Sequence, residues 1–153
     1  MLKFFLIILL IPIVLSCYLK QNIIQENELS KAIDDFVVLY KENSFEKSLK
    51  SILIYYEKDK ERIFISDIPF ETLASFEQEN QLIGNYKNIY FEMYATEINT
   101  FKNPDFQIYT KEEINQLFPK LMLEYNPKIE VIYNFKNRKK TIKKDNSTEE
   151  EKF

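Results

Sequence analysis

The sequence predicts an α+β fold, in which an N-terminal helix is followed by an antiparallel sheet of about four or five strands, with one or two further helices on one face. Three observations predict it. Apolar residues recur with a helical period over Glu28–Lys41, several later segments have the composition and alternation of strands, and Thr110–Glu113 is a helix-capping sequence. Hydrophobic residues make up 45% of the chain, which is enough for one domain with its own core.

The composition changes three times along the chain and divides it into four segments. Residues 1–16 are an apolar leader, and residues 17–26 form a short polar tether. Residues 27–135 hold the single α+β domain. Residues 136–153 are first basic, then acidic and nearly free of apolar side chains, so we expect a disordered charged tail there.

The first helix is predicted over Glu28–Lys41, with Asn27 as its N-cap. Its apolar side chains share one stripe, whereas Asp34 and Asp35 fall outside it and are expected in solvent. Adjacent acids on a helix point about 100° apart, so these two do not form a paired site. The stripe consists of Leu29, Ile33, Phe36, Val37 and Tyr40.

The sheet is predicted from short apolar or alternating segments. The first two strands form a hairpin through the charged turn 58–61, and Gly84 marks a bulge or turn within the third. A short helix over Phe70–Gln78 separates the second and third strands. The expected strands are Ser48–Glu57, Arg62–Ile68, Leu82–Tyr86, Ile89–Ala95 and Ile129–Phe135.

A loop over Glu97–Phe106, turning at residues 103–105, precedes the last predicted helix. Thr110 is its N-cap and Glu113 completes the capping box. This helix is expected to turn three apolar side chains inward: Ile114, Leu117 and Phe118.

The leader, Met1 to Cys17, has the layout of a secretory signal peptide. Lys3 precedes an apolar run over Phe4–Leu15, and small residues follow. The run is about a dozen residues long, whereas a membrane-spanning helix needs about twenty. The segment is therefore predicted to direct export.

The end of the leader resembles the lipobox of bacterial lipoproteins, with Val14 at the aliphatic position, Ser16 at the small one, and then Cys17. The resemblance implies cleavage between Ser16 and Cys17, a diacylglycerol on the Cys17 sulfur and an acyl chain such as palmitate on the new N-terminus. Two or more chains anchor a protein stably. The implied location is the bacterial cell envelope, with the domain outside the cytoplasm. Tyr18, which replaces the inner-membrane retention Asp of enteric lipoproteins, favours the outer membrane.

Two other interpretations of the leader stay open. Cys17 can be an ordinary residue beside a conventional cleavage site, or the apolar run can be an uncleaved anchor. Cys17 is the only cysteine, so no intramolecular disulfide can use it.

The composition excludes several kinds of site. The chain has no histidine, so it has neither a Ser-His-Asp triad nor a histidine metal ligand. Its one cysteine and one glycine exclude a zinc cluster and a glycine-rich phosphate loop. Residues 17–135 carry thirteen basic and twenty acidic side chains, which argues against nucleic-acid binding. We therefore predict no catalytic, cofactor-binding or metal-binding residues.

Tyrosines are the candidate binding residues. Tyr55, Tyr56, Tyr86, Tyr90 and Tyr94 fall in predicted strands and can line one exposed face of the sheet. Aromatic side chains are favoured at interfaces. The alternative is that helices cover this face and that only the hydroxyl groups reach its rim.

Two charged features are weaker candidates for a site. Asp67, Glu92 and Glu130 lie in or beside strands and would form a general acid–base pair only if they converge, which their spacing does not indicate. The basic segment Lys136–Lys144 can contact anionic head groups or a polyanion, or be a solvated tail.

These observations predict a non-enzymatic binding or interaction protein, attached to the membrane through lipid on Cys17. Its partner would be a protein or an envelope polymer. A first alternative is a protective, immunity-type protein that neutralises a toxin or lytic enzyme. A second alternative is a carboxylate-dependent hydrolase.

Overall fold

The computed structural model describes residues 26–44, 48–57, 60–73, 81–94, 101–118, 125–144 and 147–153. The predictions for the leader, including cleavage at Ser16 and lipid attachment at Cys17, lie outside these residues.

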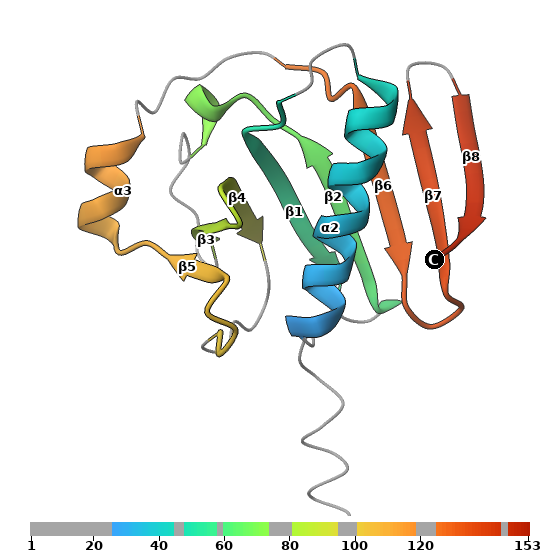
Figure 1. Cartoon of the computed structure of the whole chain (residues 1–153), viewed down its shortest axis with the longest axis horizontal. Helices are drawn as coiled ribbons and strands as arrows, with labels where there is room; N and C mark the ends of the chain where they lie inside the picture. The colour runs from blue at the N-terminus through green and yellow to red at the C-terminus, as the bar shows by residue number, and fades with distance from the viewer. Residues whose placement is uncertain are drawn as a thin grey trace, which may run out of the picture.

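Eight strands form one sheet in the order β5-β3-β4-β1-β2-β6-β7-β8 (Figure 1). All neighbours are antiparallel except β1 and β4, which are parallel. The strands are β1 Ser51–Glu57, β2 Arg62–Asp67, β3 Gln81–Tyr86, β4 Ile89–Tyr94, β5 Phe106–Ile108, β6 Ile129–Asn134, β7 Lys139–Lys144 and β8 Ser147–Lys152. The helices in the described residues are α2 Glu26–Asn43, α3 Lys111–Leu117 and the 3-10 helix η2 Phe70–Thr72.

The predicted sheet of four or five strands with one or two further helices on one face is wrong. In the described part of the chain, the fold is mostly sheet, and its one long helix is near the N-terminus. The unexpected strands are β5, β7 and β8. β5 has only three residues, which is too short to show a strand period, whereas β7 and β8 have too few apolar residues to show one. These strands are stabilised instead by neighbours that are distant in the sequence or oppositely charged.

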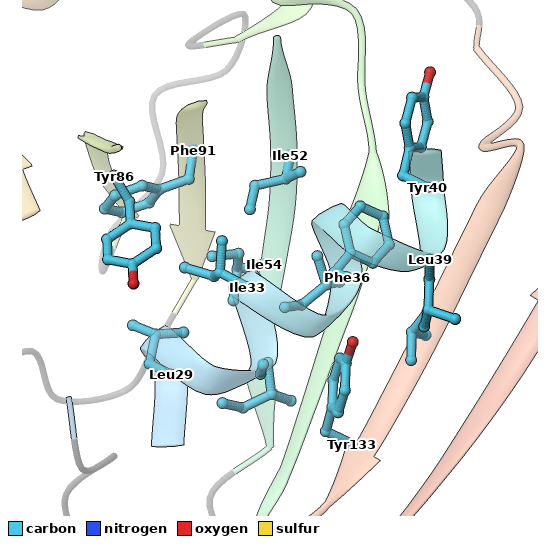
Figure 2. Close-up of a cluster of buried hydrophobic side chains, with 14 of the residues drawn as sticks. Leu29, Ile33, Phe36, Leu39, Tyr40, Ile52, Ile54, Tyr86, Phe91 and Tyr133 are labelled. Atoms are coloured by element: carbon cyan, nitrogen blue, oxygen red, sulfur yellow. The ribbon is translucent and has the colours of Figure 1, made fainter. Parts of the chain in front are cut away.

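Helix α2 lies across one face of the sheet and forms the main core with it (Figure 1). Four residues of its predicted stripe, Leu29, Ile33, Phe36 and Tyr40, are buried, whereas Val37 is half-buried. Figure 2 shows the buried side chains of α2 directed at the sheet, over Ile54 of β1 and Tyr133 of β6. Burying a side chain such as Phe36 stabilises the fold by about 1.5–3 kcal/mol. The helix begins at Glu26, so Asn27 lies inside it and is not the N-cap.

A smaller cluster lies on the opposite face, toward the β3 end of the sheet. Leu73, Ile83 and Phe118 are buried there, with Phe70 and Tyr90 packed against them. The Thr110–Glu113 capping box that begins α3 is present as predicted. Phe118 belongs to the cluster and Ile114 packs against it, but Leu117 is 45% exposed rather than inward.

Gly84 lies within the regular pairing of β3 with β4 and β5, and not at a bulge or turn. A Cβ atom here would lie 2.6 Å from the Gln107 carbonyl oxygen and 2.6 Å from Cζ of Phe91. The absent side chain therefore lets the Phe91 ring pack directly over the backbone. The two-residue turn that follows, Lys87-Asn88, has positive φ at both residues (48° and 70°), as a type I′ hairpin requires.

Residues 139–144 and 147–152 form an antiparallel hairpin where we expected a disordered tail. Ile142 of β7 is 1% exposed and reaches the main core, and Phe153 packs against Tyr133 and Phe135 with ring centroids 5.1 and 5.3 Å apart. Ile142 and Phe153, the two apolar residues of this segment, thus attach it to the domain. Its lysines in β7 form ion pairs with its glutamates in β8.

Candidate interaction face

The face of the sheet opposite α2 carries an apolar row at its centre. Side chains alternate between the two faces of a strand, so residues paired across strands share a face. The strand register places Tyr94, Tyr55, Phe64 and Ile132 side by side on β4, β1, β2 and β6. We call these four residues the apolar row.

Tyr55 is the most exposed member of the apolar row. Its side chain is 54% exposed, and the other three members are half-buried. The rings of Tyr55 and Phe64 meet edge to face with centroids 6.1 Å apart, a favourable geometry for an aromatic pair. Among the described elements, α2 packs on the opposite face and α3 packs beside Tyr90, so neither helix covers Tyr55.

Polar and charged groups border the apolar row. On one side, Glu92 is 3% exposed, and its Oε1 accepts hydrogen bonds from Gln81 Nε2 (2.5 Å) and from the Tyr94 hydroxyl. Burial, followed by the hydrogen bond to Glu92, raises the pKa of Tyr94, so its hydroxyl stays a donor at neutral pH. Also on this side, Lys143 Nζ lies 2.5 Å from Glu130 Oε1.

Arg62 lies at the other border of the row, where the register places Glu57 and Asn134 beside it. Its Nε atom is buried and has no hydrogen-bond partner among the residues that the structure describes. The face therefore has an apolar centre and a border of both charges.

The structure separates the five candidate tyrosines. Tyr55 and Tyr94 belong to the apolar row. Tyr90 is on the same face, but Phe70, Phe118 and Tyr109 surround its ring. Tyr56 and Tyr86 are on the α2 side: Tyr56 packs against the main core, and the Tyr86 hydroxyl donates to Asp34 (3.2 Å).

Phe64 and Ile132 belong to the apolar row but are not among the candidate binding residues predicted from the sequence. The alternation of each strand contains the signal for them. Ile63 and Ile65 are buried under α2, so Phe64 between them points to the opposite face. The same holds for Ile132, because Val131 and Tyr133 are buried.

The three candidate carboxylates do not converge. Glu92 and Glu130 share a face but lie three strand positions apart, which is about 14 Å at the usual strand spacing. Asp67 is on the α2 side and is 3% exposed. The described residues contain no group of acids, histidines or cysteines suited to hold a metal ion.

Asp67 joins β2 to the start of β6. Its carboxylate accepts hydrogen bonds from the backbone N–H groups of Lys128 (2.9 Å) and Ile129 (3.0 Å) and from the Tyr125 hydroxyl. A cavity of about 410 Å³ opens beside it, lined by Tyr40, Lys50 and Phe70 among others. Since its oxygens accept from the protein's own donors, we interpret Asp67 as structural.

In the part of the chain that the structure describes, no helix is both long and apolar enough to cross a membrane. Comparisons with protein-family models, with curated proteins and with solved structures found no match.

Proposed function

We propose that this protein is a membrane-tethered binding protein of the bacterial cell envelope, and that it binds a partner protein through the apolar row. The observation that carries the proposal is the exposed Tyr55 at the centre of an apolar row with a charged border. Protein–protein interfaces have this arrangement, and tyrosine is enriched among the residues that contribute most to binding.

The tether follows from the lipobox resemblance of the leader. Cleavage after Ser16 and lipid on Cys17 would leave eight residues, 18–25, between the anchor and Glu26, where α2 begins. The nine residue-to-residue steps from Cys17 to Glu26 span at most about 30 Å when fully extended. The sheet would therefore stay close to the membrane and meet partners there, outside the cytoplasm, with the outer membrane favoured by Tyr18.

Binding rather than hydrolysis is supported by the separation of the candidate carboxylates among the described residues. A protective role against a toxin or lytic enzyme is the same proposal with a specific partner. An envelope polymer is the other kind of partner, and the crosslinking experiment below distinguishes a polymer from a protein.

The test introduces a photo-crosslinking amino acid at Ile132 in the full-length, membrane-anchored protein. Crosslinking should give a discrete protein adduct, and Tyr55→Ala should weaken it by roughly 30-fold, the effect of a residue central to an interface. Val38→Ala is the matched control, because Val38 is 55% exposed on α2 and faces away from the sheet. An equal loss with both variants, or an adduct of polysaccharide only, would contradict a protein partner at this face.

The anchor is tested separately with Cys17→Ser. This change should release the protein into a soluble fraction or leave an unprocessed precursor, as mass spectrometry of the mature N-terminus would show. If neither processing nor membrane association changes, the lipoprotein part of the proposal is wrong, whatever the result at Tyr55.

A further inference from the structure

We infer that the outer edge of β8 binds an extended, lysine- or arginine-rich segment of another protein, which adds to the sheet as a further strand. This site is distinct from the apolar row. Tyr55 is on β1, and four strand spacings, or about 19 Å, separate β1 from β8.

β8 is an open edge of the sheet. Among the described strands, it pairs with β7 alone and is the outermost strand in the sheet order, as Figure 1 shows. All six of its residues are exposed. In an antiparallel strand, alternate residues direct their N–H and C=O groups away from the neighbour, so these groups are available to a new strand. The other edge strand, β5, has only three residues.

The charges of β8 define which strand fits. Glu149, Glu150 and Glu151 are consecutive, so they project alternately to the two faces of the sheet. A partner strand with basic residues at consecutive positions meets these glutamates on both faces. A strand with basic residues at every second position meets them on one face only.

β7 already shows this pairing inside the molecule. Its sequence is Lys-Lys-Thr-Ile-Lys-Lys, and its lysines form ion pairs with all three glutamates. The N–O distances are 3.7 Å for Lys139–Glu150, 3.5 Å for Lys140–Glu151 and 3.5 Å for Lys144–Glu149. The glutamate side chains stay 68%, 50% and 53% exposed, which leaves room for a second set of cations on the outer side.

The same charges disfavour a second copy of β8 as the added strand. In an antiparallel β8–β8 pair centred on Glu150, this residue faces its own copy and Glu149 faces Glu151. In a parallel pair in register, each glutamate faces its own copy. Like charges directly opposite each other destabilise a strand pair. The glutamates thus protect the edge from self-association while attracting a basic strand.

The experiment uses the full chain, labelled with ¹⁵N, in micelles of a non-ionic detergent. The probe is a synthetic peptide with the sequence of residues 139–144, blocked at both ends. We expect it to slow amide hydrogen exchange in β8 and to shift the β8 amide signals more than those of β1. A matched peptide with proline in place of its threonine and isoleucine keeps all four charges but cannot pair as a strand.

The Glu150→Gln protein should bind the lysine peptide about threefold more weakly, as expected for the loss of one exposed ion pair. Equal binding of the proline peptide would overturn the inference, because charge alone would then account for binding. It would also be overturned if the lysine peptide left β8 exchange unchanged. If protection of the β8 amides depended only on protein concentration, the added strand would be a second copy of this chain, and the inference would be overturned.

Discussion

Two regions of the same sheet are stabilised in different ways. The central strands β4, β1, β2 and β6 pack their apolar side chains under α2, and Ile52, Ile54, Ile63 and Ile65 are fully buried. The β7–β8 hairpin has the same antiparallel geometry, but β8 has no buried side chain and β7 reaches the core mainly through Ile142. The hairpin is stabilised by its backbone hydrogen bonds, by ion pairs and by the packing of Phe153.

The parts of the sheet that stabilise the fold are therefore not the parts that stay accessible to partners. Burial of apolar area in the centre contributes most of the free energy of folding. Exposed ion pairs contribute little each, but they leave charged side chains and backbone groups accessible. The centre of the sheet therefore determines whether the protein folds, whereas the hairpin and the apolar row are the parts that can contact partners.

The largest expected effect is in the centre. Phe36→Ala removes a fully buried ring between α2 and the sheet, and should lower the free energy of unfolding by about 3–5 kcal/mol. Chemical denaturation monitored by circular dichroism measures this. Ile52→Val is a milder variant at the same interface, with an expected loss of about 0.5–1.5 kcal/mol.

Val38→Ala is the matched control on the same helix, because Val38 is 55% exposed. It should change the free energy of unfolding by less than about 0.5 kcal/mol. A loss for Phe36→Ala no larger than that of Val38→Ala would show that α2 does not stabilise the centre.

An intermediate effect is expected where the hairpin meets α2. Lys140 of β7 is 6% exposed, and its Nζ lies 2.9 Å from Oδ1 of Asp35, whose Oδ2 accepts from the Tyr133 hydroxyl at 2.9 Å. Asp35→Ala leaves both donors with one fewer partner in a largely buried site. We expect it to destabilise the protein by about 2 kcal/mol, the range for hydrogen bonds to charged groups.

The neighbouring residue provides the control for this variant. Asp34 also contacts a tyrosine and a lysine, Tyr86 and Lys87, but in this pair both charged side chains are about half exposed. Asp34→Ala should therefore cost only about 0.5 kcal/mol. Equal losses for the two variants in thermal unfolding would contradict the contrast between buried and exposed pairs.

The sequence predicts the elements whose stability is local. The period of α2, the apolar strands of the β1–β2 hairpin and the capping box of α3 each depend on neighbouring residues, and all three are present. The parallel pairing of β1 with β4 depends on contacts between residues about forty positions apart, which no local pattern encodes. The β7–β8 hairpin was not predicted because Ile142 is the only apolar residue on its inner face, and because the burial of Lys140 depends on its pairing with Asp35, which is distant in the sequence.

The candidate site was predictable in part for the same reason. Tyr55 and Tyr94 were selected by residue type, and the structure places them side by side. Phe64 and Ile132 required the strand alternation to be followed across all four strands. Tyr56 was selected with Tyr55, although adjacent residues of a strand must face opposite sides.

The smallest expected effect is the response of the hairpin to salt. Raising sodium chloride from about 0.05 M to about 0.5 M shortens the Debye length from about 14 Å to about 4 Å. The pairs Lys139–Glu150 and Lys144–Glu149, whose glutamates are more than half exposed, are weakened by this screening, so amide hydrogen exchange in β8 should accelerate about twofold. Exchange in β1 and β2 should stay unchanged, because apolar burial stabilises these strands.

The control is the triple variant Glu149→Gln, Glu150→Gln, Glu151→Gln. It should lose the salt response of β8 and keep the exchange rates of β1. If β1 and β8 instead respond equally to salt, ion pairs do not distinguish the hairpin from the centre of the sheet.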